Sequence, residues 1–338
     1  MKSNYVELTD VGKSRLNVEE IDTDDLRDNE AIIRAEYSLI SAGTELSRAF
    51  ALKKGFKYPV RPGYSMVGRI VKKGKDINAE EGDRVFANCP HASLVRWSDG
   101  DDVQGPFIRK LPEGIDPKEA TIINLGLVAM QGVELTDVRP GYTVGVFGLG
   151  NIGILTALMY RKMGCRVIGL DIVSERCLLA RTMGIEDVVD CADQKEAIDE
   201  LTDGKGLDIA VDVTGLSPVI IKAIECAKAY GQVLLLGSPR QSYETDVTGM
   251  LSNIHMKDLK VLGGFNKTVP VHETEGYENC MDGNFDKVCG MIMNRDLDIS
   301  KMISDVIDPA DCEKAYYDLM YNKDRSSCII YDWSRYGE

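Results

Sequence analysis

The sequence predicts an α/β protein with two parts, a β-rich part and a doubly wound parallel sheet that follows it. Between residues 30 and 110, short strand-like runs are broken by Gly, Pro and Asp. From about residue 125, apolar strand-like runs alternate with helical stretches, which is typical of a parallel sheet covered by helices. We expect the first domain at 1–124, completed by 267–338, and the second at 125–266.

The individual elements follow from the same patterns. In the first part, the runs at 31–35 and 67–71 have the composition of strands. In the second part, we expect parallel strands at 143–147, 166–170, 208–213, 232–237 and 259–264. After residue 266 the alternation ends, and we assign the remaining chain to the first domain, with helices near 277–294 and 309–322 and a strand-like run at 327–331.

A glycine-rich turn follows the first strand of the second part. The run at 143–147 leads into six residues with glycine at the first, third and sixth positions, Gly148-Leu149-Gly150-Asn151-Ile152-Gly153. Gly148 allows a tight turn, Gly150 lets the backbone approach a phosphate, and Gly153 lets the next helix pack closely on the strand. Because the N-terminal amides of that helix attract negative charge, we predict that these six residues bind the pyrophosphate of a dinucleotide.

An acidic residue ends the next strand. Asp171 lies eighteen residues after Gly153, where a carboxylate accepts the ribose hydroxyls of the adenosine half and repels a 2'-phosphate. Arg176 follows too late, on the next helix, to form a phosphate pocket by itself. We therefore predict NAD(H) as the cofactor, with Asp171, Ile172 and Arg176 near its adenosine end. A helix N-cap is the alternative role for Asp171.

Two later strands complete the predicted cofactor site. The runs at 208–213 and 232–237 should end at the same edge of the sheet as the glycine turn, because ligands of such sheets bind at the carboxyl ends of the strands. The residues that we expect there are Val213, Thr214, Gly215, Gly237 and Ser238.

Composition and charge exclude several classes of partner. The 338 residues are 44% hydrophobic and carry a formal charge of -14, which disfavours nucleic acid and anionic membranes as partners. No apolar stretch approaches the roughly 20 residues that span a bilayer, and the first residues lack the apolar core of a secretory signal. The nine cysteines show no C-x-x-C spacing, as expected of reduced thiols. We expect a cytoplasmic protein with a small-molecule substrate.

Several motifs carry a resemblance to a known family. The segment 82–86 is similar to a G-D-R-V strand, 139–144 to the lead-in of the glycine turn, and 41–45 to a C-G-T-D stretch. With this domain order, the chain resembles the medium-chain dehydrogenase/reductase superfamily. Together, 41–45 and 62–68 resemble its branch labelled zinc-binding or bacteriochlorophyllide-type dehydrogenase.

This resemblance implies a GroES-like catalytic domain followed by a Rossmann domain. It also implies NAD(P)-dependent chemistry on CH–OH groups. The expected assembly is a homodimer or homotetramer, joined through the last strands of the nucleotide domain near 259–264.

The metal positions depart from the family pattern. Zinc-dependent members hold their catalytic metal with a cysteine, a histidine and an acid or second cysteine, and the matching positions here are Ala42, Tyr64 and Asn124. Alanine has no donor atom, and neither a phenol nor an amide is a usual zinc ligand. Only Cys89 lies between residues 80 and 120, so the four-cysteine structural lobe is also missing. We predict that the protein binds no metal.

Without zinc, side chains must stabilise charge on the substrate oxygen and move the proton. Tyr64 is the first candidate, because its phenol can donate a hydrogen bond to a carbonyl oxygen; the alternative is an ordinary packed tyrosine. His91 is the second candidate, because an imidazole can accept a proton, although an isolated loop histidine is usually structural. Asn124 is the third candidate, a polar side chain where the resemblance places the substrate cleft.

Two residues of the 41–45 segment complete the catalytic candidates. Glu45 is either a general base or, as we prefer, a hydrogen-bonding support behind the site. Thr44 matches the hydroxyl that relays the substrate proton in the family, and it could also cap a helix near 45–51. A rebuilt metal site of Cys89, His91 and Glu45 is a less favoured alternative.

The leading functional hypothesis is an NAD-dependent, zinc-independent oxidoreductase. It would interconvert a secondary alcohol and a ketone on a polar small molecule of the sugar, polyol or cyclitol class. A quinone or enoyl reductase is the alternative enzyme, since zinc-free members often reduce activated double bonds, although these usually prefer NADPH. A non-catalytic NAD(H)-binding sensor or scaffold is the alternative from another class.

Overall fold

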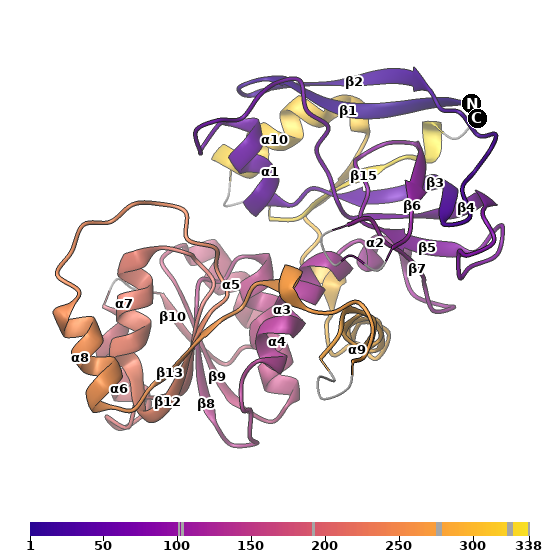
Figure 1. Ribbon diagram of the computed structural model, residues 1–338. Helices are drawn as coiled ribbons and strands as arrows, with labels where there is room; N and C mark the ends of the chain where they lie inside the picture. The colour runs from indigo at the N-terminus through magenta and orange to yellow at the C-terminus, as the bar shows by residue number, and fades with distance from the viewer. Residues whose placement is uncertain (101, 103–104, 191–192, 275–278, 323–326, 337–338) are drawn as a thin grey trace. The chain divides into compact units, whose positions relative to one another are not determined.

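The computed structural model divides the chain into two compact units (Figure 1), which we call the first unit and the second unit. The residues that it describes are 1–100, 102, 105–190, 193–274, 279–322 and 327–336. The first unit contains 1–124, 270–294 and 302–338, and the second contains 125–269 and 295–301. The first boundary coincides with the predicted one. The chain returns at residue 270 rather than 267, and 295–301 joins the second unit.

The second unit is built on a parallel sheet. Its six described strands have the order β10-β9-β8-β11-β12-β13, and their bounds are β8 (Thr143–Phe147), β9 (Arg166–Asp171), β10 (Asp187–Asp190), β11 (Leu207–Asp212), β12 (Ala227–Leu235) and β13 (Lys260–Gly263). The chain direction across the sheet reverses between β8 and β11, and ligands of such sheets bind at this reversal point. Five of these strands were predicted; β10 was missed because its four residues contain only two apolar side chains.

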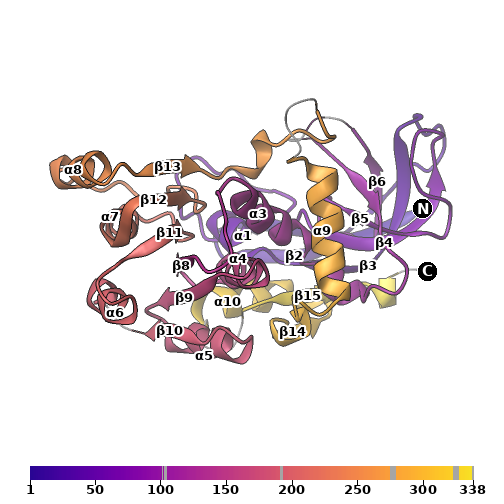
Figure 2. The same cartoon turned by 90° about the horizontal axis from the view of Figure 1, so that it is seen from below.

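Helices cover both faces of this sheet, as Figure 2 shows. On one face lie α4 (Asn151–Lys162) and α5 (Ser174–Thr182). On the other face lie α6 (Gln194–Leu201), α7 (Ser217–Cys226) and α8 (Thr248–Met256), while α3 (Ile123–Glu134) precedes β8. Apolar side chains from the strands fill the core, and Leu170, Ala210 and Val233 are almost completely buried. This is the doubly wound Rossmann arrangement that the sequence predicts.

The first unit is β-rich. A two-stranded sheet pairs β1 (Lys2–Asp10) with β2 (Lys13–Glu20). A larger sheet has the order β14-β15-β3-β4-β5-β7, with β6 also paired to β3. Its strands are β3 (Glu30–Leu39), β4 (Met66–Lys73), β5 (Arg84–Ala87), β6 (Leu94–Ser98), β7 (Ile108–Lys110), β14 (Asp305–Ile307) and β15 (Ile329–Asp332).

The last part of the chain completes this first unit. Strand β15 pairs antiparallel with β3, and the side chains of Tyr331 and Trp333 are fully buried in the core. The helices of this unit are α1 (Ala42–Ala49), α2 (Pro117–Ala120), α9 (Met281–Met293) and α10 (Cys312–Tyr321). Of these, α9 and α10 correspond to the helices expected near 277–294 and 309–322. Residues 277 and 278 lie outside the described residues.

Two general properties of the described chain bear on its environment. Across the described ranges, no helix combines the length and the apolar character needed to cross a membrane. The eight cysteines that the structure describes are all unpaired and buried. Burial raises the pKa of most of these thiols, including those of Cys177 and Cys226 to about 11, so they stay protonated near neutral pH.

Candidate functional site

The glycine turn in the second unit has the geometry that a pyrophosphate needs. Gly148 adopts a φ of +101°, in the region that favours glycine. A methyl group on Gly153 would overlap the carbonyl oxygen of Gly148, so only glycine allows α4 to start this close to β8. Gly150 is the N-cap of α4, and a methyl group on it would meet none of the described atoms within 4 Å. The open space at the amino end of α4 fits a phosphate group.

Asp171, at the end of β9, contacts this turn directly. Its Oδ2 accepts a hydrogen bond from the backbone N–H of Leu149 at 2.7 Å, and its Oδ1 accepts from those of Ile172 and Val173. The N-cap of α5 is Val173, not Asp171, so the N-cap role proposed as an alternative is wrong. Because a carboxylate oxygen has two lone pairs, Oδ2 keeps the capacity to accept a ribose hydroxyl.

Arg176 lies closer to this acid than its place in the sequence suggested. It belongs to α5, and its guanidinium is 3.5 Å from Oδ2 of Asp171. The Arg176 side chain is 36% exposed, so a cofactor at Asp171 would also meet a positive charge. This arrangement holds an acceptor for ribose hydroxyls beside a cation that attracts phosphate.

The loops after β11 and β12 meet at the carboxyl edge of the sheet, as predicted. A methyl group on Gly215 would overlap the carbonyl oxygen of Ser238, and the backbone N–H of Gly237 donates to the carbonyl oxygen of Asp212. The buried carboxylate of Asp212 accepts hydrogen bonds from Thr214 and Gly215 and so holds the first loop. Burial raises the pKa of Asp212, against the effect of these bonds. Asp212 was not among the predicted site residues, because its role is to hold the loop that follows β11 and this depends on contacts that the sequence does not show.

Two further backbone hydrogen bonds connect the loops at this edge of the sheet. The backbone N–H of Val213 donates to the carbonyl oxygen of Phe147 at 3.0 Å, which joins the β11 loop to the glycine turn. The backbone N–H of Arg240 donates to the carbonyl oxygen of Gly215 at 3.3 Å. Arg240 is exposed, and its positive charge acts on the Asp212 carboxylate. Only a structure could reveal this cation, because it follows the predicted loop by two residues.

A cluster of hydroxyl groups forms the second candidate site, in the first unit. The phenol oxygen of Tyr64 contacts the hydroxyl oxygen of Ser41 and lies 3.2 Å from that of Thr44. The side-chain amide of Asn124 donates to the backbone carbonyl of Tyr64 at 3.3 Å. The structure therefore brings together three of the predicted catalytic residues, and adds Ser41 to them.

The environment of Tyr64 keeps its phenol protonated. Burial raises the pKa of Tyr64, and its hydrogen bonds with Ser41 and Thr44 oppose that shift only in part. A protonated phenol is a hydrogen-bond donor. Thr44 is exposed, whereas Tyr64 is half-buried, so the cluster reaches the surface of the first unit through Thr44.

Helix α1 positions this cluster. It begins after its N-cap residue Ser41, three residues earlier than the helix that we expected near 45–51. Thr44 therefore lies within the first turn, and the capping role considered for it is wrong. One face of α1 buries Glu45, Leu46 and Ala49, and this leaves Thr44 on the exposed face.

Glu45 lies behind the hydroxyl cluster and is 1% exposed. Its Oε1 accepts a hydrogen bond from the backbone N–H of Ser41 at 2.8 Å. Its Oε2 accepts from the phenol of Tyr316 at 2.7 Å and lies 3.0 Å from Nε2 of His91. These three contacts satisfy the hydrogen-bonding capacity of a buried carboxylate. These contacts favour the supporting role for Glu45 over that of general base.

His91 is fully buried and belongs to the same network. Because the Glu45 carboxylate is an acceptor, the ring carries a hydrogen on Nε2. Its Nδ1 lies 2.8 Å from the hydroxyl of Ser38, which in turn accepts the indole N–H of Trp333 at 2.8 Å. Both ring nitrogens are thus engaged away from solvent. This placement argues against the expectation that His91 takes a proton directly from substrate.

The side chains at the family's metal positions do not fit a catalytic zinc. Ala42 offers no donor atom, the phenol of Tyr64 is engaged with Ser41, and Asn124 uses its amide N–H on a backbone carbonyl. The rebuilt site considered for Cys89, His91 and Glu45 does not form, since the thiol of Cys89 instead lies 3.2 Å from the sulfur of Met66. Within the described parts of the chain, no three potential metal ligands gather.

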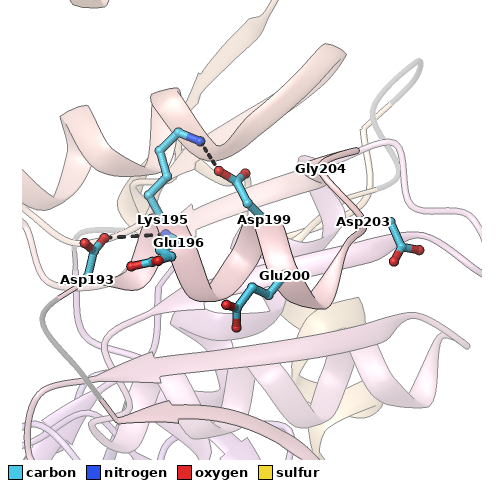
Figure 3. A pocket seen from close by; sticks show the side chains of 7 residues that line it. All are labelled: Asp193, Lys195, Glu196, Asp199, Glu200, Asp203 and Gly204. Atoms are coloured by element: carbon cyan, nitrogen blue, oxygen red, sulfur yellow. Dashed lines mark hydrogen bonds and ion pairs between the residues drawn. The ribbon is translucent and has the colours of Figure 1, made fainter.

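A further hollow lies on the surface of the second unit, along α6 (Figure 3). It is lined by Asp193, Lys195, Glu196, Asp199, Glu200, Asp203 and Gly204. Its one cation, Lys195, is paired with Asp199 at 2.5 Å, and the carboxylate of Asp193 accepts the N–H of Glu196 at the start of α6. An anionic cofactor would be repelled here, so this hollow is not the dinucleotide site.

Comparisons with known proteins agree with this architecture. A family model described as zinc-binding dehydrogenase matches residues 151–280. The chain is 29% identical to alcohol dehydrogenase 1 of Trifolium repens over 219 residues, which are 62% of this chain and 53% of that protein. It is 26% identical to an alcohol dehydrogenase of Geobacillus stearothermophilus over 260 residues, 67% of this chain and 75% of that one. The match thus spans about half the length of the Trifolium protein.

Solved structures share the fold over almost the whole chain. An Escherichia coli oxidoreductase of unknown specificity has a TM-score of 0.82 at 19% identity, covering 98% of this chain and 99% of that one. Galactitol-1-phosphate dehydrogenase of Escherichia coli has a TM-score of 0.82 at 17% identity, covering 97% and 99%. A protein of Sinorhizobium meliloti described as a zinc-binding dehydrogenase, solved with NADP, has a TM-score of 0.79 at 19% identity, covering 98% and 99%.

These findings show that the chain is similar to zinc-binding dehydrogenases over residues 151–280 and to alcohol dehydrogenases over about two thirds of its length. Over almost its whole length it shares the fold of solved dehydrogenases. The family model covers 151–280 and therefore omits Ala42, Tyr64 and Asn124. Its description consequently carries no information on whether these positions hold zinc.

Proposed function

We propose that this chain is an NAD(H)-dependent oxidoreductase that interconverts a secondary alcohol and a ketone on a polar small molecule, without a catalytic zinc. The observation that carries the proposal is the hydroxyl cluster of Tyr64, Ser41 and Thr44 at the position where relatives of this family bind metal. The two curated relatives are named alcohol dehydrogenases, which supports chemistry on CH–OH groups. A sugar, polyol or cyclitol fits the polar character of the cluster.

The second unit would hold the cofactor. The pyrophosphate would lie on the amides around Gly150, and Asp171 would accept the ribose hydroxyls. When bound, the nicotinamide accepts a hydride from the alcohol or donates one to the ketone. We prefer NAD(H) because of the Asp171 carboxylate; the adjacent Arg176 and the NADP bound to the Sinorhizobium protein are the observations that favour NADP(H).

The hydroxyl cluster would perform the proton chemistry. In ketone reduction, the phenol of Tyr64 donates a hydrogen bond to the substrate oxygen and passes its proton to that oxygen as negative charge develops there. Thr44 is exposed and lies 3.2 Å from the phenol oxygen, so it can return a proton from solvent to Tyr64. Alcohol oxidation uses the same groups in reverse.

The buried network behind the hydroxyl cluster would hold its hydroxyl groups in position. Glu45 accepts the backbone N–H of Ser41, whose hydroxyl contacts the Tyr64 phenol. Fixing the Ser41 backbone also fixes where the phenol points, and positioning of this kind supports proton transfer. Tyr316 and His91 hold Glu45 in turn, so they act on the reaction only through other residues.

Cofactor titration and substrate panels test this function. We expect NADH to bind more tightly than NADPH, and turnover on a polyol or sugar panel to exceed turnover on an enone and quinone panel. Preferential reduction of enones with NADPH would establish the alternative enzyme. Tight NADH binding without turnover on either panel would instead indicate the sensor or scaffold.

Location and assembly are further parts of the proposal. We propose a cytoplasmic protein, which is supported by the unpaired, buried state of the eight described cysteines. We also propose a homodimer or homotetramer joined through β13. This strand forms one edge of the six-stranded sheet, and its Val261 is 41% exposed, as expected of a strand that pairs with a second copy.

A further inference from the structure

Four cations gather on α1 and the loop that follows it. They are Arg48, Lys53, Lys54 and Lys57. The three lysines are exposed and Arg48 is half-buried. Among the residues that the structure describes, no carboxylate or hydrogen-bond acceptor pairs with these four side chains, and we call them the basic rim.

The protein has 54 acidic and 40 basic residues, and more than half of these basic residues pair with a carboxylate among the described residues. Several other arginines of the first unit pair with carboxylates: Arg69 and Arg84 with Glu36, and Arg96 with Glu30. Arg34, an exposed arginine on β3, has no such partner in the described part of the chain. Arg48 is half-buried as a residue, and its guanidinium, with five N–H donors and no described partner, is free to bind an anionic ligand. An overall charge of -14 would also repel an anionic substrate, so recognition of an anion needs local positive charge.

The basic rim lies next to the hydroxyl cluster. Arg48 follows Thr44 by four residues on α1, and residues at this spacing lie on the same face of a helix. Thr44 is 3.2 Å from the phenol oxygen of Tyr64. The positive charge of Arg48 also acts on that phenol: burial raises the pKa of Tyr64, and Arg48 opposes the rise. Arg48 is therefore within electrostatic reach of the proposed reaction centre.

Hydrogen bonds hold the lysine loop against α1. At its start, the backbone N–H of Leu52 donates to the carbonyl oxygen of Ser47 at 3.0 Å. At its end, the phenol of Tyr58 donates to the backbone carbonyl of Arg48 at 2.5 Å. Because both ends of the loop bind the last turn of α1, Lys53, Lys54 and Lys57 stay near Arg48.

We propose that Arg48 determines substrate specificity by binding a phosphate monoester on the substrate, while the substrate's reacting oxygen lies at Tyr64 and Thr44. A planar guanidinium binds phosphate oxygens in a bidentate manner, and the three lysines raise the local concentration of the dianion. The inference rests on the function proposed above and adds a substrate class to it: a phosphorylated sugar or polyol rather than the free alcohol.

A structural role for Arg48 makes a different prediction. A basic side chain in the last turn of a helix stabilises the helix dipole, and Arg48 occupies the last turn of α1. In that case, replacing Arg48 would lower the melting temperature without changing the preference between phosphorylated and free substrates.

Matched substrate pairs test the proposal with the full chain and NAD. The pairs are sorbitol 6-phosphate with sorbitol and glycerol 3-phosphate with glycerol, and gluconate serves as a carboxylate probe. We expect the phosphorylated member to have the higher kcat/KM. Arg48→Gln should raise its KM roughly 10- to 100-fold with little change in kcat, and Arg48→Lys should recover part of the loss. Arg34→Gln is the matched control, since Arg34 is an exposed cation on β3.

Three results would overturn the inference. The first is equal kcat/KM for both members of each pair. The second is an equal loss on both members in Arg48→Gln, which would mean that Arg48 acts only through Tyr64. The third is a preference for gluconate over the phosphorylated substrates.

A binding measurement separates this inference from the proposed reaction. Calorimetric titration of glycerol 3-phosphate into the protein saturated with NADH needs no turnover. If no alcohol is oxidised but the wild type binds this ester and Arg48→Gln binds it more weakly, the proposed reaction fails and the anion site stands. If the wild type does not bind the ester, or if Arg48→Gln binds it equally well, the anion site is refuted.

Discussion

The phenol oxygen of Tyr64 lies 3.2 Å from the hydroxyl oxygen of Thr44, and the two residues come from separate segments of the first unit. Thr44 stands on α1, and Tyr64 precedes β4. The resemblance to zinc-dependent dehydrogenases would place a zinc-binding histidine at position 64. Here a protonated phenol and a threonine hydroxyl meet instead, so hydrogen bonding can take over the stabilisation of charge on a substrate oxygen.

The first prediction is that treatment with a metal chelator does not affect turnover. Because the side chains of Ala42, Tyr64 and Asn124 do not fit a zinc ion, prolonged dialysis against a chelator should leave turnover unchanged. Elemental analysis of the purified protein should find less than one zinc per chain. Stoichiometric zinc, with loss of activity on its removal, would contradict this prediction.

Asp171 should govern the choice of cofactor. Asp171→Asn keeps an acceptor for the N–H of Leu149 but removes the charge that repels a 2'-phosphate, so the ratio of NADPH to NADH affinity should rise by roughly 10-fold or more. Fluorescence titration of both cofactors measures this ratio. Asp203→Asn is the control, since Asp203 is exposed on the same unit. An unchanged ratio would mean that Arg176 or other contacts decide the preference.

The buried carboxylate of Glu45 should matter for stability. Glu45→Leu removes the acceptor for Ser41, Tyr316 and His91, and leaves these buried donors without a partner. We expect a loss of about 3 kcal/mol or more in the free energy of unfolding, measured by urea denaturation. Glu113→Leu, at an exposed position, should change it little. A loss of similar size in both variants would show that the network does not support the fold.

Stability should also fall at alkaline pH. Burial, together with the nearby Glu45 carboxylate, raises the pKa of Tyr316 well above its ordinary value near 10, and burial does the same for Tyr331. The folded state thus keeps protons that the unfolded chain releases from about pH 10 upward. This stability is fully present below that pH and is lost as the pH rises further. Urea midpoints between pH 8 and 11 should show the decline, and Tyr316→Phe should make it shallower; an equally steep decline in Tyr316→Phe would contradict this assignment.

The proposed assembly can be tested at β13. Val261 is exposed on this edge strand, and the neighbouring α8 leaves Leu251 54% and Met256 75% exposed. A positive charge at the edge should oppose pairing with a second copy, so Val261→Lys should shift the mass measured by light scattering toward that of a monomer. Val18→Lys, at an exposed valine of β2, should not. A monomeric wild-type protein would refute the proposed interface.

Local patterns were sufficient to predict most of the fold and the strand ends that meet at the candidate cofactor site. The glycine turn, Asp171 and the ends of β11 and β12 are each encoded within a few residues, and a parallel sheet brings such strand ends to one edge. The short β10 was missed because Asp187–Asp190 offers too few apolar side chains to form a pattern.

The catalytic neighbourhood was harder to predict, because its contacts join distant segments. Tyr316 binds Glu45 across 271 positions in the sequence, and Trp333 binds Ser38 across 295. No local pattern encodes such pairs. Glu45 and His91 were therefore predictable as polar candidates, but their buried contact with each other was not. The anion-binding role that we propose for Arg48 likewise depends on the absence of a described carboxylate partner, which the sequence alone does not show.

Tyr64→Phe tests the central claim most directly. The assay uses a polar ketone and saturating NADH, and the control is Tyr317→Phe, at an exposed tyrosine of the same unit. We predict that kcat for reduction falls about 100- to 10,000-fold in Tyr64→Phe. The affinity for NADH should stay that of the wild type. An unchanged kcat in Tyr64→Phe would contradict the claim that this phenol replaces the metal.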